Sequence, residues 1–157
     1  MDGARLTIAR ESPLGPDLAL LMARHTIDMH ADTPPESIHM MDASQLAIAS
    51  VAFYVMRLDG KVVAMGAFKQ FDGPHAEIKS MHVLSENRGQ GLSRILLDHL
   101  VAEAKAAGMT RLSLETGAQS MFAPAHRLYT RAGFADCPPF GSYRLDANSV
   151  FMTLTLA

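Results

Sequence analysis

The sequence predicts a mixed α/β (α+β) domain built in layers around one central sheet. A length of 157 residues suits one domain over residues 1–157. The middle of the chain alternates polar and apolar residues between two glycine-containing turns, which predicts a meander of strands. The second half alternates helical and strand periods, which predicts helices packed on the same sheet. Hydrophobic residues make up 48% and charged residues 19%, a globular rather than a disordered composition.

The first third of the chain predicts one strand followed by helices. The predicted elements are a strand at Leu6–Arg10, a helix from Pro16 to about His30, and a second helical stretch from Glu36 toward Leu46. Either Asp17 or Ser12 is expected to cap the first helix. The run Thr33–Pro35 ends that helix, because a residue before proline avoids the helical region.

The middle third predicts three consecutive strands joined by tight turns. These strands are Val51–Leu58, Lys61–Phe71 and Ala76–Val83. Asp59-Gly60 is a two-residue hairpin turn, and Asp72–Pro74 is the second turn. His75 is expected to belong to that turn.

The last part of the chain predicts helices and strands in alternation. The elements are a helix from Leu92 to Ala104 stopped by Gly108, a strand at Arg111–Glu115, a helix from Pro124 stopped by Gly133, a short strand at Phe134–Cys137, and a final strand at Val150–Leu156. We see no internal repeat and no interdomain linker.

Composition narrows the classes of function. The net charge of −2 and the pI of about 6.4 leave no basic excess for non-specific nucleic-acid binding. Cys137 is the single cysteine, so the chain cannot form an internal disulfide. The N-terminal residues lack the layout of a signal peptide, and no apolar run reaches the roughly 20 residues of a membrane helix. We therefore expect a cytoplasmic enzyme or binding domain that acts on neither nucleic acid nor membrane.

The segment with the clearest chemistry is a strand, Ala76–Val83, that leads into the glycine-containing loop Arg88–Ser93 and then a helix. The first N–H groups of a helix have no internal partner, so such a loop suits a phosphate ligand. Gly89 and Gly91 remove side chains that would hold a pyrophosphate away from the backbone, and Arg88 adds a permanent cation.

The spacing of this loop excludes two other phosphate-binding patterns. It lacks the Gly-Lys-Ser/Thr ending of a Walker loop, and it lacks the third glycine of a dinucleotide-binding loop. Taken alone, the loop is equally well explained as a tight turn that caps a helix.

Three segments in order resemble the GNAT family of acyl-CoA N-acyltransferases. Arg88–Ser93 resembles the family's Arg/Gln-x-x-Gly-x-Gly/Ala loop, and Glu77–Val83 resembles its cofactor-contacting strand. Ala125–Tyr129, followed by Gly133-Phe134, resembles its Ala-x-x-Leu-Tyr-x-x-x-Gly-Phe helix. The resemblance runs from about Val51 to the C-terminus, and more loosely from Leu6.

This sequence departs from the family pattern at two positions. Ser93 stands where the loop usually ends in Gly or Ala, and serine is small enough for the pyrophosphate still to fit. Phe122 stands where the helix motif often has an Asn, so any contact made by that Asn is not expected here.

The resemblance implies a mixed, mostly antiparallel sheet flanked by helices, and acetyl-CoA as co-substrate without a metal. Two central strands, Ala76–Val83 and Arg111–Glu115, would splay apart and leave the thioester between them. Backbone groups would bind the pantetheine arm like an added strand, and the loop would hold the pyrophosphate. The residues assigned to these contacts are Met81, His82 and Val83 for the arm, and Arg88, Gly89, Gln90, Gly91, Leu92, Ser93 and Arg94 for the pyrophosphate.

The resemblance also assigns catalytic roles. Glu77 is expected to be the general base for the amine, and Tyr129 the acid for the leaving thiolate. A backbone N–H near Val83 would stabilise the oxyanion. His82 is a rival base. Strict alternation places Glu77 and His82 on opposite faces of the strand, and a bulge between them would change that parity.

Several residues keep alternative interpretations. Glu115 is either a supporting hydrogen-bond acceptor or a substrate contact. Phe140–Tyr143 resembles the tail of a bacterial GNAT subgroup and is either an acceptor-site wall or a plain loop. The helices between Leu18 and Leu46 would form the opposite wall. Cys137 is expected to be a small, partly buried residue, and a metal site at His25, His30 and His39 is not expected, because no ligand spacing completes it.

We therefore predict an N-acetyltransferase that transfers acetyl from acetyl-CoA to a primary amine by direct attack in a ternary complex. The acceptor is left open among a small amine or amino acid, an antibiotic-like molecule, a peptide N-terminus and a lysine. The first rival is a non-catalytic acyl-CoA sensor with the same fold, and the second is a nucleotide-binding enzyme that uses the glycine loop. A homodimer would cover the exposed edge of the meander.

Overall fold

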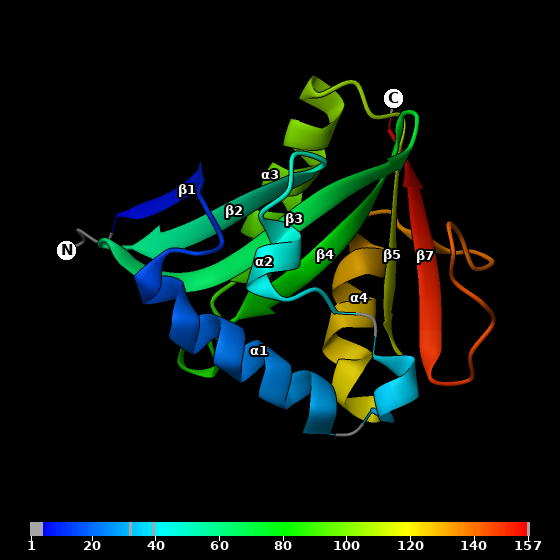
Figure 1. The fold of residues 1–157 in the computed structure, drawn as a ribbon, viewed down its shortest axis with the longest axis horizontal. Coiled ribbons are helices and arrows are strands. Elements are labelled where there is room, and N and C mark those ends of the chain that lie inside the picture. The colour runs from blue at the N-terminus through cyan, green and yellow to red at the C-terminus, as the bar shows by residue number, and fades with distance from the viewer. Residues whose placement is uncertain (1–4, 32, 39, 157) are drawn as a thin grey trace.

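The fold is a seven-stranded sheet with helices on both faces (Figure 1). The computed structural model describes residues 5–31, 33–38 and 40–156. The elements are β1 (Leu6–Arg10), α1 (Ala19–Ala31), α2 (Ala43–Leu46), β2 (Val51–Leu58), β3 (Lys61–Asp72), β4 (His75–Val83), α3 (Leu92–Ala106), β5 (Arg111–Gly117), α4 (Ala123–Arg131), β6 (Ala135–Asp136) and β7 (Ser149–Thr155). The predicted strands and the two later helices are therefore present, with ends that differ by a few residues.

The sheet is mostly antiparallel, with strand order β1-β2-β3-β4-β5-β7-β6. Its one parallel contact, between β4 and β5, pairs only His75–Glu77 with Arg111–Ser113. Beyond that short ladder the two strands diverge, which Figure 1 shows at the centre of the sheet. The resemblance to the family predicted this divergence. It opens the sheet beside the glycine loop Arg88–Ser93 and helix α4.

Each face of the sheet carries its own core. Helices α1 and α2 cover one face, where Leu18, Leu21 and Leu46 pack with Phe53 and Val55. Helices α3 and α4 cover the other face, where the buried residues include Leu97, Leu100, Leu112 and Tyr129. Within the parts of the chain described here, no helix has the length and apolarity to cross a bilayer.

Two predictions for the first third were wrong. The Pro16–His30 helix begins as a 3-10 turn at Pro16–Leu18 after Gly15, with no side-chain cap. The hydroxyl of Ser12 instead accepts from the N–H of Leu14 at 3.2 Å, and the Asp17 carboxylate accepts from Arg57 at 2.7 Å. Both proposed caps are therefore engaged elsewhere.

The predicted second helix, Glu36–Leu46, is two short pieces rather than one. A 3-10 turn covers Pro35–Ser37, and α2 covers only Ala43–Leu46. Asp42 restarts the helix because its carboxylate accepts from the N–H of Gln45 at 2.8 Å, while the Gln45 side chain accepts from the N–H of Asp42 at 2.9 Å. The assignment of His75 to a turn was also wrong, since it opens β4.

A β-bulge in β4 decides which side chains share a face. Met65 of β3 lies opposite His82 of β4, and Ala67 lies opposite Lys79. The same stretch of ladder therefore advances two residues along β3 and three residues along β4. Within this bulge Ser80 adopts a left-handed φ of 59°, which is uncommon for a non-glycine residue. The extra residue reverses the parity, and Glu77 and His82 both lie on the face covered by α1 and α2.

Candidate active site

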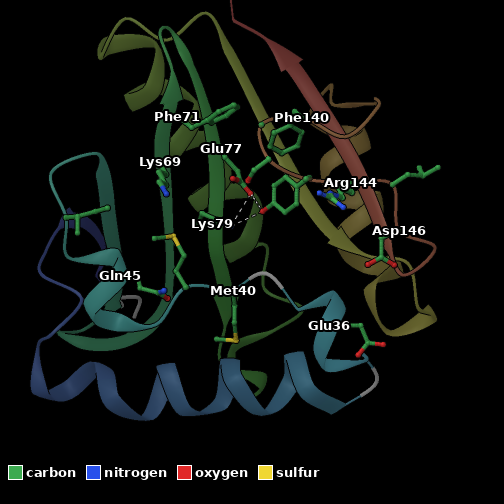
Figure 2. Close-up of a pocket in the computed structure, with 16 residues that line it drawn as sticks. Glu36, Met40, Gln45, Lys69, Phe71, Glu77, Lys79, Phe140, Arg144 and Asp146 are labelled. Carbon is green, nitrogen blue, oxygen red and sulfur yellow. Dashed lines mark hydrogen bonds and ion pairs between the residues drawn. The ribbon is translucent and has the colours of Figure 1, made fainter.

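Four neighbouring cavities lie along β4, and one of them is lined by β5 as well. The loop cleft, about 370 Å³, lies between the glycine loop and α4, and the strand cleft, about 360 Å³, continues from it between β4 and α4. The wide cleft, about 800 Å³, opens on the α2 side of the sheet (Figure 2). A small junction cavity of about 130 Å³ lies between them and is lined by both Glu77 and Tyr129.

The loop cleft is shaped by backbone conformation. Gly89 and Gly91 have φ values of 79° and 78°, a region that glycine adopts without strain. Gly91 is the N-cap of α3 and supplies no side-chain cap, so the first N–H groups of the helix remain available at the cleft. Leu92, which is buried, and Ser93 both line the cleft.

Cations gather along this cleft from two helices. Arg94 lines it from α3 and donates to Asp98 at 2.9 Å. Arg127 and Arg131 line it from α4, one helical turn apart. Sequence reasoning missed these two arginines, although the four-residue spacing after Pro124 was a signal that they share a face.

Two predicted loop residues have different surroundings from those expected. The Arg88 guanidinium donates to the Val83 carbonyl at 2.9 Å and to the Asp28 carboxylate at 3.0 Å. It therefore bridges the loop to α1 and lies beside both the loop and strand clefts. Gln90 is exposed and lines none of the cavities described here. Any contact of Gln90 with a phosphate would have to come from its backbone.

Met81, His82 and Val83 line the strand cleft together, as their assignment to one ligand arm requires. Beyond Glu77 this edge of β4 has no ladder with β5, so it can accept an extended ligand as an additional strand. The Val83 carbonyl is already engaged by Arg88. Phe122, which replaces the family's usual Asn, lies across this cleft and contributes a ring in place of an amide.

Glu77 is held in a polar cluster at the edge of the wide cleft. Its side chain is buried, and its Oε2 accepts a hydrogen bond from the Tyr143 hydroxyl and lies 3.2 Å from the ammonium of Lys79. Lys79 also donates to the Tyr143 hydroxyl at 2.9 Å. The cluster, labelled in part in Figure 2, fixes the direction of the carboxylate and balances its charge.

Burial and the Glu77 carboxylate together raise the pKa of Tyr143, so its hydroxyl keeps its proton and acts as a donor. Tyr143 and Lys79 were not assigned to the site from sequence. The available signals were the spacing of Lys79 two residues after Glu77 on one strand face, and the position of Tyr143 in the tail. Phe140 and Tyr143 both line the wide cleft, so the tail forms one wall of that cleft.

Tyr129 lies on the opposite side of the junction from this cluster. It is buried on α4, packs edge-on against Phe134 at a centroid distance of 5.7 Å, and lines both the junction and the strand cleft. Burial raises the pKa of its hydroxyl, which therefore stays protonated near neutral pH. The structure thus places Glu77 and Tyr129 on two sides of one small cavity.

His82 forms a buried pair with His25 of α1. Their Nδ1 atoms are 3.3 Å apart, and the Asp28 carboxylate lies 4.0 Å from His82 Nδ1. Burial is the main cause that lowers the pKa of both rings, that of His25 to about 4. His25 lines the junction cavity with Glu77, whereas His82 lines the strand cleft.

Three further predictions from the sequence concern Glu115, Cys137 and a metal site. Glu115 lines the junction and accepts from the Ser149 hydroxyl at 2.7 Å. Cys137 is partly buried, as expected, and burial raises the pKa of its thiol. Among the described residues, no group of three His, Cys, Asp or Glu side chains is placed to hold a metal ion, and His39 lies outside the described residues.

Comparison with known proteins identifies the architecture. The sequence model of the acetyltransferase (GNAT) family matches residues 21–134. This chain belongs to the GNAT family. The match covers most of α1, the β4 strand, the glycine loop, and α4 with its following Gly133-Phe134. The family expectation drawn from the three sequence segments is therefore confirmed.

Relatives of the GNAT protein span nearly its whole length. It is 38% identical over 150 residues to the uncharacterized N-acetyltransferase YedL of Escherichia coli (strain K12), covering 96% of this chain and 94% of that protein. It is 40% identical over 151 residues to the IAA acetyltransferase of Azospirillum brasilense, covering 94% and 95%. These names support acetyltransferase activity for this chain.

Solved structures support the same fold. The PaiA N-acetyltransferase of Thermoplasma acidophilum in complex with coenzyme A has a TM-score of 0.76 over 96% of this chain and 99% of that one. At 14% identity, this likeness concerns the fold alone. The predicted fold class, a mixed and mostly antiparallel sheet with helices on both faces, is confirmed.

Proposed function

We propose that this GNAT protein transfers an acetyl group from acetyl-CoA to a primary amine, by direct attack within a ternary complex. The observation that carries the proposal is the junction cavity, because Glu77 and Tyr129 both line it. On one side Tyr129 also lines the strand cleft, and on the other Glu77 also lines the wide cleft. A thioester and an amine that enter from opposite sides would meet there.

The residues present fit coenzyme A. The loop cleft combines the uncapped N-terminus of α3 with the cations Arg94, Arg127 and Arg131, which suits a pyrophosphate. The strand cleft continues from it along the unpaired edge of β4 and suits a narrow pantetheine arm. Arg88, which lies beside both clefts and donates to Asp28, would add a fourth cation to the phosphate side.

Glu77 would act as the general base. An alkylamine is mostly protonated near pH 7 and must lose a proton before it can attack. The Glu77 carboxylate faces the wide cleft in a direction fixed by Lys79 and Tyr143, and would take that proton directly or through a water. His82, now shown to share the face of Glu77, is directed at His25 and the strand cleft, which favours Glu77 as the base.

Two groups would serve the acyl side. The thioester oxygen gains negative charge during attack, and a backbone N–H near Val83 on the free edge of β4 would stabilise it. Tyr129, whose raised pKa keeps it protonated, would give its proton to the departing thiolate. The nitrogen of the protonated amine would lose two protons, one to Glu77 before attack and one to water as the tetrahedral intermediate collapses. Tyr129 would give one proton to the thiolate and regain one from water, while one C–N bond is made and one C–S bond is broken.

A paired binding and turnover experiment tests the proposal. CoA and acetyl-CoA should raise the unfolding midpoint, with about 2.7 kcal/mol of added stability at one hundred times the dissociation constant, whereas ATP and NAD should not. Acetyl-CoA with a panel of primary amines should then release free thiol together with an acetylated amine identified by its mass. A shift with CoA but no release with any amine would favour the non-catalytic sensor. A larger shift with ATP or NAD would contradict the proposal entirely.

A further inference from the structure

The wide cleft contains two cations that have no counter-ion in the described parts of the chain. Lys69 of β3 is half-buried, Arg144 of the tail is exposed, and both line the cleft. No hydrogen bond or ion pair joins either side chain to another described residue. Figure 2 shows Lys69 on one side of Glu77 and Arg144 on the other. The positive charge of both is therefore available to a ligand.

Among the described residues, no acid of the cleft forms an ion pair with Lys69 or Arg144. The Glu77 carboxylate is engaged by Tyr143 and Lys79. Asp146 accepts from the Ser37 hydroxyl at 2.7 Å and from the N–H of Asn148 at 2.8 Å. Glu36 is exposed at the far end of the cleft in Figure 2. The cleft therefore carries charges of both signs, and the two cations that flank Glu77 in Figure 2 are not paired with its acids, which favours an anionic group on a molecule that binds between them.

From this arrangement we propose that the acceptor is an amino acid, a primary amine with a carboxylate next to it and an apolar side chain. The proposal deepens the proposed function, on which it rests. Lys69 is paired with Glu77 across the β3–β4 ladder, and opposite side chains on antiparallel strands have Cβ atoms about 5 Å apart. An amine beside Glu77 therefore has its α-carboxylate within reach of Lys69.

Arg144 completes the recognition from the other wall. It follows Tyr143, the residue that holds Glu77, so the tail carries it to the same end of the cleft. A guanidinium binds a carboxylate through two parallel hydrogen bonds, which fixes the orientation of the bound molecule. The cleft also has apolar lining that suits the substrate side chain, contributed by Met40, Met41, Ile48, Phe71 and Phe140.

The test measures binding separately from catalysis. The protein is saturated with free CoA, which carries no acyl group and cannot react, and is then titrated calorimetrically. The probes are L-phenylalanine, its amide, and phenethylamine, which share the ring and the amine and differ in the carboxylate. We expect L-phenylalanine to bind at least about tenfold more tightly than the other two. Equal affinity for the three, or no binding of L-phenylalanine, would overturn the inference.

Three variants locate the carboxylate. Lys69→Gln and Arg144→Gln should each lower the affinity for L-phenylalanine about tenfold and leave that for phenethylamine unchanged. Lys105→Gln, an exposed lysine in the last turn of α3, is the matched control and should change neither. Unchanged affinity for L-phenylalanine in both cleft variants would overturn the assignment.

A separate turnover assay distinguishes this inference from the proposed function. If phenethylamine is acetylated as efficiently as L-phenylalanine, acyl transfer stands and the carboxylate preference is wrong. If L-phenylalanine binds through Lys69 but no amine is acetylated, the carboxylate site stands and acyl transfer is wrong.

Discussion

The loop cleft and the wide cleft differ in how they are built, although both end at the junction between β4 and β5. The loop cleft comes from two short segments, residues 83–94 and 124–131, and depends on backbone N–H groups and on glycines with positive φ. The wide cleft draws on three distant segments, residues 36–48, 69–79 and 140–146, and depends on side chains. Binding of a ligand by backbone N–H groups requires only a few glycines at fixed positions, so a short sequence pattern is enough to predict it. Binding by side chains differs from one substrate to another, and the side chains of the wide cleft come from segments too far apart to form a local sequence pattern.

The largest effect should come from the boundary between the two clefts. Glu77→Gln keeps the size of the side chain and removes the base, so kcat should fall by about 10²- to 10⁴-fold. CoA should still raise the unfolding midpoint of the variant as it does for the parent protein, because Glu77 does not line the loop cleft or the strand cleft. Initial rates of thiol release and thermal unfolding provide the two readouts.

Asp136→Asn is a suitable carboxylate control, since Asp136 is exposed on β6 and lines none of the four cavities. A Glu77→Gln protein that keeps kcat within threefold of the parent, roughly 0.7 kcal/mol, would remove Glu77 from the mechanism.

The next largest effect should arise at Tyr129, on the cofactor side of the junction. Tyr129→Phe removes the acid for the thiolate and should lower kcat by about 10²-fold. Because burial raises the pKa of Tyr129, the hydroxyl is protonated throughout the assay range, and the loss should be constant from about pH 6 to pH 9. The pH profile of kcat for parent and variant checks this.

Tyr54→Phe controls for loss of a buried hydroxyl, since Tyr54 lies in the core and lines none of the described cavities. If both tyrosine variants slow the reaction equally, the Tyr129 effect is structural rather than catalytic.

A smaller effect is expected from substitutions in the loop cleft, which should weaken CoA binding without changing binding of the acceptor in the wide cleft. Arg127→Gln and Arg131→Gln should each weaken CoA binding by about three- to tenfold, because each removes a cation from the phosphate side. The loss should shrink as salt rises, since exposed charges are screened. Calorimetric titration with CoA at two salt concentrations measures both, and the KM of the acceptor should not change. A change in acceptor KM equal to that in CoA affinity would mean that the clefts are not independent.

The smallest effect concerns stability rather than activity. Burial lowers the pKa of His25 from 6.5 to about 4, so between these values the unfolded chain binds a proton that the folded protein does not. Stability from this group is therefore fully present above pH 6.5 and is lost as pH falls toward 4. His25→Gln should flatten the decline of the unfolding midpoint in this window, whereas His30→Gln, at an exposed position, should leave the slope as it is. Identical slopes for both variants would contradict this assignment.

The elements predicted correctly are those whose signals are local. The Asp59-Gly60 turn and the period-two strands around it predicted the meander to within about a residue at each end. The α3 helix could be placed because Leu92, Leu96 and Leu100 mark its buried face. By contrast, the stretch Glu36–Leu46 has helix-compatible residues throughout, and the restart at Asp42 depends on a capping box that was not recognised.

The features of the candidate site also divide into those that local sequence predicted and those that it did not. The glycine loop and the splayed strands were predicted from contiguous residues and a family resemblance. The Glu77 cluster was not, because Tyr143 reaches Glu77 from 66 residues away and no local spacing relates the two. The relative positions of Glu77 and His82 were also left open. They depended on the bulge at Ser80, which sequence alternation cannot reveal.

An initial-rate matrix of thiol release, with acetyl-CoA and the amine varied together, tests the central claim most directly. Direct attack at the junction requires both substrates to be bound at once, so reciprocal plots should give lines that intersect, and no thiol should be released when the amine is omitted. Parallel lines, with a burst of one thiol per protein in the absence of amine, would show that the acetyl group is first transferred to the protein and would contradict the account.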